Sequence, residues 1–425
     1  MKLTHESQQL LSFFVKHNCL TPQKQTTKTD NILKILFKQI TSGVSYINEF
    51  KSKNPYTSKI ERITNYRQIP KPKTFSPDSI PSEIRRHIDK FTLNLLAYSI
   101  QIFNRKISII FLTEDEPIDN MNVVYNKYVD YMLVWLYIVN IYSSITCSVT
   151  LNIYIYHTSV VKILPISNTL VLGKTHINTA FTRTCQRDSE IVIFRKEEWF
   201  KTFIHETFHN FGLDFSGMDM KIYNTKILQI FKVKSEVKLF EAYTEFWARM
   251  INCLFCSYLN MKNKKNVNEF LSNAMIFINF ERIFSFFQMV KVLNFMDMTY
   301  PNLYDNNPDS TKIRNTMYKE DTNVLSYYII TLILFNNYQS FLSWCYTNNS
   351  TDKHNNNNTL LQFNKTPINL DKFCKFIETK YKSKHILDSI RCTEILLTDI
   401  KRRSVKKKSL GYLLRNLRMT MCELG

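Results

Sequence analysis

The sequence predicts an α+β protein, in which a small mixed α/β subdomain is followed by a helical subdomain. Between residues 107 and 194, short alternating or continuous apolar runs typical of strands stand among helical patterns. After residue 198, the long segments carry apolar residues at three- and four-residue spacing, which is the pattern of amphipathic helices. The 425 residues are 44% hydrophobic and 14% aromatic, which allows a sizeable core and excludes a disordered chain.

The first 80 residues are expected to form an N-terminal helical extension. Its helices are predicted at about 6–17 and 31–51, with a polar link at 21–30 and a proline-containing loop after them. A central unit (81–347) should follow, with its α/β part ending at about residue 197. In that part we expect helices at 82–103 and 120–143, and strands at 107–113, 149–156, around 177–182 and 190–194. A helix at about 198–212 follows it.

The rest of the chain is predicted to be helical. The expected helices are 235–260, 267–293, 321–347, 370–391 and 409–422. A last region (348–425) begins with an Asn-rich loop (348–358) and ends in a basic tail. The formal net charge is +20, and its densest cluster is Lys401-Arg402-Arg403 with Lys406-Lys407-Lys408. This cluster is either a nucleic-acid contact or address, or a solvated linker.

Two patterns bear on the cellular compartment. The nine cysteines lack framework spacing and no signal peptide is evident in residues 1–14, which favours reduced thiols in a cytosol-like compartment. The single CxxC pair, Cys253 and Cys256, lies in an apolar helical pattern and is expected to be core thiols. Residues 131–161 carry no charge, but polar residues interrupt them, so we expect a buried helix and strand and no membrane span.

One segment carries the strongest chemical pattern, His205-Glu206-Thr207-Phe208-His209, which fits HExxH. Residues four apart lie on one face of a helix, so His205 and His209 present two imidazoles to one point. Two such imidazoles match the bite of a tetrahedral zinc ion. Glu206 is one step round the helix and can accept a proton from an activated water without being a ligand. The alternative is an ordinary helix whose histidines are satisfied by other contacts.

A third ligand is needed, and two places in the sequence offer one. In the pattern HExxHxxGxxH it would follow closely, but Phe215 occupies that position and Asp214 lies one residue early. The other place is an acidic pair, Glu241 and Glu245, which share one face of a predicted helix. Their like charges become favourable if one binds a cation and the other accepts an imidazole N–H. A solvated acidic edge is the alternative interpretation.

Taken together, the HExxH segment and Glu241-Ala-Tyr-Thr-Glu245 resemble the gluzincin class of zinc peptidases, over about residues 107–260. The resemblance implies a zincin-like active site between the α/β and helical subdomains, with one Zn²⁺ per chain. It also implies that His205, His209 and Glu241 are the metal ligands. Glu206 would be the general base, and Glu245 would support a ligating His.

Other site residues follow from the same resemblance. Residues 178–182 resemble the edge strand against which gluzincins align a substrate backbone, which makes Asn178 and Ala180 candidate substrate contacts. A Tyr or His usually assists the metal in stabilising the oxyanion. Tyr327, Tyr328 and His385 lie in later predicted helices and are the candidates for this role.

The stretch from Ile193 to Phe215 is also similar to uncharacterised metallopeptidases of large DNA viruses of eukaryotes. The two resemblances imply a zinc-dependent peptidase that acts on a peptide or protein substrate. The alternative function is a catalytically silent zincin-fold scaffold, which binds protein or nucleic-acid partners through its basic surface. The expected location is cytoplasmic or virion-associated.

Overall fold

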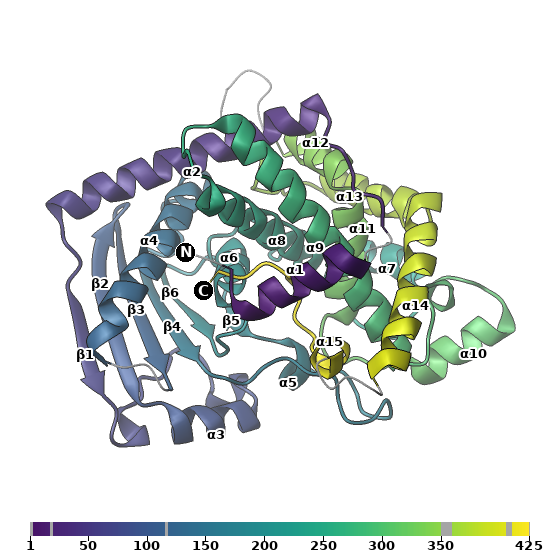
Figure 1. Cartoon of the computed structure of the whole chain (residues 1–425), viewed down its shortest axis with the longest axis horizontal. Coiled ribbons are helices and arrows are strands. Elements are labelled where there is room, and N and C mark those ends of the chain that lie inside the picture. The colour runs from purple at the N-terminus through teal and green to yellow at the C-terminus, as the bar shows by residue number, and fades with distance from the viewer. Residues whose placement is uncertain (1–2, 18–19, 115–117, 350–358, 405–409, 425) are drawn as a thin grey trace. The chain divides into compact units, whose positions relative to one another are not determined.

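The structure is a computed structural model, and it describes residues 3–17, 20–114, 118–349, 359–404 and 410–424 (Figure 1). It confirms the α+β class, because a mixed sheet lies in the N-terminal half and helices make up most of the C-terminal half. The chain divides into two compact units, which we call the sheet unit (33–161 and 179–217) and the helical unit (1–32, 162–178 and 218–425). This division differs from the three consecutive regions that the sequence predicts.

The sheet unit is built on six strands in the order β1-β2-β3-β4-β6-β5. The central strands β3, β4 and β6 are parallel, whereas β1, β2 and β5 pair with their neighbours antiparallel. The strands are β1 (Ser58–Arg62), β2 (Asn94–Ile102), β3 (Arg105–Thr113), β4 (Thr150–His157), β5 (Ala180–Thr182) and β6 (Asp188–Ile193). The expected strands are therefore confirmed, and β5 is an edge strand.

The helix expected at 82–103 is wrong in its second half. Helix α3 (Ser82–Phe91) ends early, and β2 follows it. Residues 96, 98, 100 and 102 are buried on one face of β2, a period-two pattern that belongs to a strand. Phe103 and Asn104 both have positive φ (55° and 57°), which is the geometry of a two-residue hairpin turn into β3. Strand β1 was not expected; it lies between the helix predicted at 31–51 and the proline-containing loop.

Two helices of the sheet unit matter for the site. Helix α6 (Trp199–Asn210) carries the HExxH segment, packs against β5 and β6, and contacts α4 (Ile118–Tyr142). Together α4 and β4 confirm the buried helix and strand expected in the uncharged stretch. Alternate sheet residues, such as Leu112, Tyr156 and Val192, join a core cluster with Ile84 and Ile88 of α3. Helix α2 (Thr27–Lys53) begins four residues earlier than expected.

The expectation of reduced thiols is wrong for part of the chain. In the sheet unit, Cys147 and Cys185 form a disulfide bond across 38 residues of sequence, and Cys392 is disulfide-bonded as well. The sequence spacing of Cys147 and Cys185 does not indicate that they pair. The fold brings the segment before β4, which carries Cys147, next to the turn before β6, which carries Cys185. Cys253 and Cys256 are buried free thiols, as expected.

The helical unit contains the remaining helices. They are α1 (His5–His17), α5 (Lys174–Ile177), α7 (Lys221–Ile230), α8 (Leu239–Asn260), α9 (Val267–Phe295), α10 (Pro308–Met317), a π-helix η4 (Leu325–Ile330), α11 (Thr331–Asn336), α12 (Tyr338–Asn348), α13 (Pro367–Lys380), α14 (Lys384–Ser404) and α15 (Leu410–Arg415). Two of the expected long helices are each divided. The span 321–347 becomes η4, α11 and α12, and 370–391 becomes parts of α13 and α14. Helix α15 ends at Arg415, so the helix expected to run to residue 422 is wrong beyond it.

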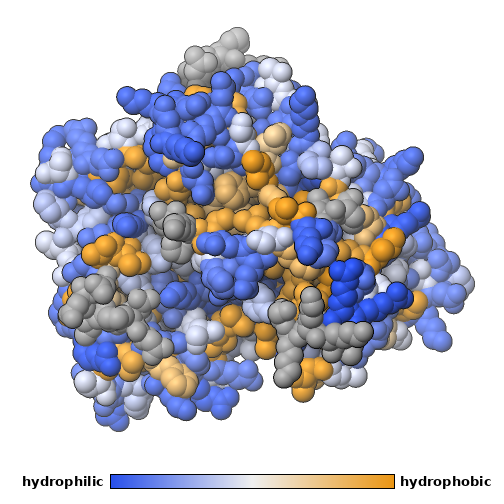
Figure 2. All heavy atoms as spheres, in the orientation of Figure 1, coloured by the Kyte–Doolittle hydropathy of each residue, from blue (hydrophilic) through white to orange (hydrophobic). Residues whose placement is uncertain are grey.

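The basic cluster is only partly described. Lys401, Arg402 and Arg403 lie in the last turn of α14, while Lys406–Lys408 and most of the Asn-rich loop lie outside the described residues. Figure 2 shows hydrophilic residues over much of the face that it draws, with hydrophobic residues in separate patches. Among the helices of the described ranges, none is long and apolar enough to cross a bilayer.

Candidate metal centre

A capping turn at Gly212 ends helix α6 and fixes its last turn. Gly212 has a φ of 65°, its N–H donates to the carbonyl of His209 (2.9 Å), and the next N–H, of Leu213, donates to Phe208 (2.8 Å). This pair of bonds is a Schellman motif, which favours glycine at the left-handed position. This turn also directs the chain back so that Asp214 reaches His209.

Side-chain hydrogen bonds anchor α6 to neighbouring elements of the sheet unit at two successive turns of the helix. At the last residue, the amide of Asn210 donates to Thr182 of β5 (2.9 Å) and accepts from Ser148 before β4 (2.5 Å). One turn earlier, Trp135 of α4 donates its indole N–H to Thr207 (2.6 Å). Because side-chain hydrogen bonds hold both turns, the positions of the two histidines are set by the scaffold.

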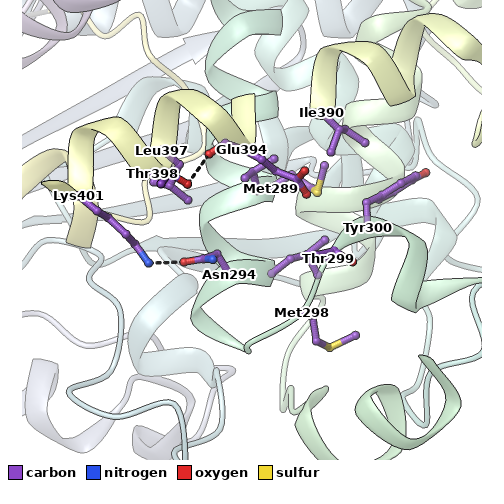
Figure 3. A pocket seen from close by; sticks show the side chains of 12 residues that line it. Met289, Asn294, Met298, Thr299, Tyr300, Ile390, Glu394, Leu397, Thr398 and Lys401 are labelled. Carbon is purple, nitrogen blue, oxygen red and sulfur yellow. Dashed lines mark hydrogen bonds between the residues drawn. The ribbon is translucent and has the colours of Figure 1, made fainter. Parts of the chain in front are cut away.

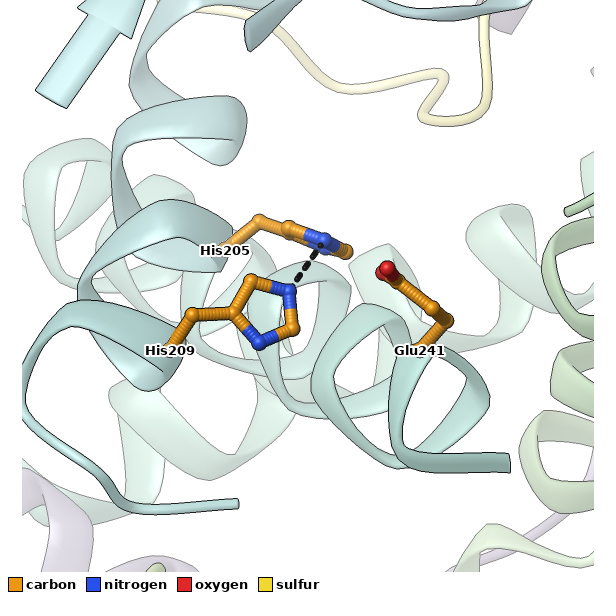
Figure 4. Close-up of side chains that lie close together, drawn as sticks. All are labelled: His205, His209 and Glu241. Atoms are coloured by element: carbon orange, nitrogen blue, oxygen red, sulfur yellow. Dashed lines mark hydrogen bonds between the residues drawn. The ribbon is translucent and has the colours of Figure 1, made fainter. Parts of the chain in front are cut away.

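The structure brings the two histidine rings together as the sequence predicts. Their Nε2 atoms lie 3.1 Å apart, and the side chains of His205 and His209 come from successive turns of α6 (Figure 4). Two nitrogens on one tetrahedral zinc ion lie about 3.3 Å apart, given Zn–N bonds of roughly 2.0–2.1 Å. His205, Glu206 and His209 are only 5%, 6% and 9% exposed.

Asp214 binds the other nitrogen of His209. Its Oδ2 accepts a hydrogen bond from Nδ1 of His209, and its Oδ1 accepts from the N–H and the hydroxyl of Ser216 (2.8 and 2.7 Å). Asp214 is fully buried; burial alone would raise its pKa, but the charge of His209 and the bonds from Ser216 lower the pKa overall. A carboxylate at Nδ1 leaves the lone pair of His209 on Nε2, the atom that faces His205.

The placement of Asp214 bears on the two possible sources of a third ligand. Because Asp214 occupies Nδ1, it orients His209 and does not share the space in front of Nε2. Glu241, in the first turn of α8, does: one ligand atom from each of His205, His209 and Glu241 lies within 4.8 Å of the others, so this group could hold a metal ion (Figure 4). Two imidazoles and one carboxylate are the ligand set of many hydrolytic zinc sites.

Glu241 itself is held by a tyrosine of the helical unit. The hydroxyl of Tyr327 donates to its Oε2 (2.9 Å), and Tyr327 is the third residue of the π-helix η4. Such π-turns are rare and frequent at functional sites. The helix predicted at 321–347 did not reveal this turn, since an insertion of this kind leaves no clear sequence pattern.

Glu245 forms a buried ion pair one turn along α8. Its Oε1 accepts from Nε of Arg249 (2.8 Å), and both side chains are almost fully buried. Arg249 also donates to the hydroxyl of Ser285 in α9 (2.9 Å) and to the carbonyl of Tyr327 (3.3 Å). Glu245 therefore helps to fix the backbone that carries Tyr327, and its expected contact with a ligating His stays a prediction.

The other candidate residues are dispersed. Ala180 opens the edge strand β5, whereas Asn178 lies before it, at the end of α5, where it accepts from Thr322 (2.7 Å). Tyr328 donates to the carbonyl of Leu417 (2.6 Å), which gives it a structural role. His385 lies in the first turn of α14 and is exposed. Of the three residues considered for the oxyanion, Tyr327 contacts the candidate ligand Glu241.

Comparison with known proteins adds no relative to this picture. No protein-family model, curated protein or solved structure matches the chain.

Proposed function

We propose that this protein is a zinc-dependent peptidase whose metal is held by His205, His209 and Glu241. The observation that carries the proposal is the convergence of these three side chains, which is the donor set expected for catalytic zinc. The buried carboxylate of Asp214 on the second nitrogen of His209 supports it, because ligating histidines usually donate that N–H to a carboxylate. The HExxH and Glu241 segments favour the gluzincin class.

When bound, Zn²⁺ supplies Lewis-acid chemistry: it acidifies water and polarises the substrate carbonyl. The protein supplies the proton transfers. Glu206 lies on α6 next to His205 and is 6% exposed. It accepts the proton of the attacking water at a carboxylate oxygen and delivers it to the leaving amine of the peptide.

Substrate alignment is assigned to the edge strand β5. An extended peptide can add to such an edge by main-chain hydrogen bonds. Ala180 begins this strand, and the whole of β5 is half-buried and pairs with β6 on one side. Asn178 lies before the strand, so we expect it to contact a substrate beside the edge strand and not along it.

The test separates metal binding from chemistry. Glu206→Gln should retain about one zinc per chain and lose at least ~100-fold in turnover of an unbiased peptide library. Glu241→Gln should lose most of its zinc, and so should His205→Ala and His209→Ala. Glu236→Gln, an exposed acid before α8, is the matched control and should change neither quantity. Equal zinc content in all variants would refute the metal site; equal turnover by Glu206→Gln would refute the base.

The second candidate function is a catalytically silent scaffold that binds protein or nucleic-acid partners. Its supporting observation is the net charge of +20, part of which lies in the last turn of α14. A scaffold needs ligands but no base, so the presence of Glu206 favours the enzyme. Absence of turnover in a zinc-loaded wild type would favour the scaffold.

The compartment is a separate proposal. The sequence favours a cytoplasmic or virion-associated protein, with the similarity to viral metallopeptidases as the reason for the latter. Between these two locations, the disulfide of Cys147 and Cys185 favours the virion. Disulfides persist in oxidising surroundings and are rare in the cytosol.

A further inference from the structure

The helical unit contains an open groove, and none of the candidate metal ligands is among its lining residues. It has a volume of about 640 Å³ and is lined by residues of α7, α13 and the segments that follow each of them, together with Tyr304 and Asn306. Four lysines line it: Lys226, Lys232, Lys375 and Lys382. The segments 221–234 and 371–384, which supply most of the lining, contain nine lysines against two acids and are strongly basic.

The lysines differ in what they contact. Lys226 pairs with Asp371, and Lys375 pairs with Glu378 (2.9 Å). Lys232 donates to the side-chain oxygen of Asn306, a neutral partner, and Lys382 lies over two tyrosine rings. Neither of these last two has an ion pair among the described residues, so two positive charges in the groove are uncompensated.

Aromatic rings lie beside these charges. The ammonium of Lys382 is 5.8 Å from the ring centre of Tyr304 and 5.3 Å from that of Tyr381. The two rings are 5.4 Å apart and nearly perpendicular, and the hydroxyl of Tyr300 holds the carbonyl of Tyr381 (2.6 Å). Both rings are half-buried, so they are fixed and still reach the surface.

A second hollow of the helical unit is of a different kind. It lies between α9 and α14, has a volume of about 190 Å³ and is mostly apolar, with Met289, Met298 and Tyr300 in its wall (Figure 3). Its polar end holds Lys401, which donates to Asn294. A small apolar hollow does not fit a charged polymer, whereas the basic groove does.

We propose that the groove between α7 and α13 binds single-stranded nucleic acid. Ammonium groups beside aromatic rings match a nucleotide, whose phosphate lies next to a base with an open π-face. Lys232 and Lys382 would contact phosphates, and Tyr304 and Tyr381 would stack with bases. An acidic peptide would use the lysines but gain nothing comparable from the rings. The site is distinct from the basic tail, and it does not depend on the proposed peptidase activity.

The experiment measures binding of the full chain to a labelled mixed-sequence single strand of about 12 nucleotides, by fluorescence anisotropy at about 50–200 mM salt. Lys232→Ala with Lys382→Ala should weaken binding at least ~10-fold. The double variant should also make the plot of log affinity against log salt concentration less steep, by about 1.4 in slope. Each phosphate contact on a single strand contributes about 0.7 to the steepness. Tyr304→Leu, which keeps an apolar side chain, should weaken binding at least ~5-fold through lost stacking.

Three controls make the result decisive. Lys34→Ala with Lys38→Ala removes two exposed lysines of α2 and should change affinity less than ~2-fold. Lys401→Ala with Arg402→Ala tests the basic tail, and a loss confined to this variant would overturn the proposal. His209→Ala should bind normally, which separates this site from the metal centre. No binding by the wild type would overturn the proposal. The proposal would also be overturned if polyglutamate displaced the labelled strand as effectively as the unlabelled strand does and Tyr304→Leu had no effect on binding.

Discussion

Asp214 lies against Nδ1 of His209, on the side of the ring opposite the nitrogen that faces His205. The contact exists because the Schellman turn at Gly212 reverses the chain directly after α6. A buried carboxylate at this position fixes both the orientation and the tautomer of the imidazole, and it makes the free nitrogen a stronger donor to a cation. The two hydrogen bonds from Ser216 to Oδ1 act to lower the pKa of Asp214, which favours the ionised carboxylate.

Asp214→Asn should therefore weaken zinc binding by about 10–100-fold without abolishing it. The amide can still accept the ring N–H, so the geometry survives while the charge is lost. Competition with a chromophoric chelator at fixed pH measures the affinity. Asp219→Asn, an exposed acid five residues on, is the control and should bind zinc as the wild type does. Unchanged zinc affinity in Asp214→Asn would show that the carboxylate does not act through His209.

Sequence reasoning alone does not give Asp214 this role. The HExxH pattern predicts the helix and the facing pair His205 and His209, because helical periodicity determines which residues share a face. The contact of Asp214 depends on a turn whose geometry is set by one glycine, and its residue is one position away from the spacing of a familiar ligand pattern. An acid five residues after the second His, beyond a C-terminal glycine, is the signal that could have identified it.

The errors in the fold have a similar origin. The end of α3 and the start of β2 are separated by only two residues, and the apolar residues there fit both helical and alternating patterns. The hairpin turn at Phe103 and Asn104 contains no glycine, so the usual sequence signal for such a turn is missing. The pairing of Cys147 with Cys185 depends on tertiary contacts, which spacing does not encode.

Tyr327 should matter for the metal through Glu241. Tyr327→Phe removes the hydrogen bond to Oε2 of Glu241 and keeps the ring, so zinc affinity should fall by about 10-fold while the fold is retained. Tyr328→Phe is a matched control, because this neighbouring hydroxyl bonds to the carbonyl of Leu417. It should leave zinc affinity unchanged and lower only stability. Zinc titration with the same chelator and a thermal unfolding curve distinguish the two. Equal zinc affinities for both variants would contradict the role of Tyr327.

Glu320 gives a prediction about pH. It lies before η4, where its carboxylate accepts from the hydroxyls of Ser235 (2.6 Å) and Tyr318 (2.8 Å) and from the N–H groups of Val324 and Leu325. Burial raises the pKa of Glu320 to about 7, although these hydrogen bonds act to lower it. The same residue thus connects the segment before α8 with the start of the π-helix.

Because the folded pKa of Glu320 exceeds its ordinary value of 4.5, the folded state binds the extra proton between these two pH values. The resulting stabilisation is fully present below about pH 4.5, falls as pH rises, and is lost above about pH 7. A shift of this size corresponds to roughly 3 kcal/mol, at about 1.4 kcal/mol per pH unit. Glu320→Gln does not titrate, so its stability should change less than that of the wild type across this range.

The measurement is the free energy of unfolding of both proteins, from denaturant titrations at about pH 4.5 and pH 8. The difference between wild type and Glu320→Gln removes the contribution of every other titrating group. It should move by about 3 kcal/mol in favour of the variant as the pH rises. Glu236→Gln, an exposed acid near the same segment, should show a difference that does not vary in this way. If the stabilities of wild type and Glu320→Gln run parallel across the range, Glu320 stays ionised in the folded protein, and its four hydrogen bonds outweigh the cost of burial.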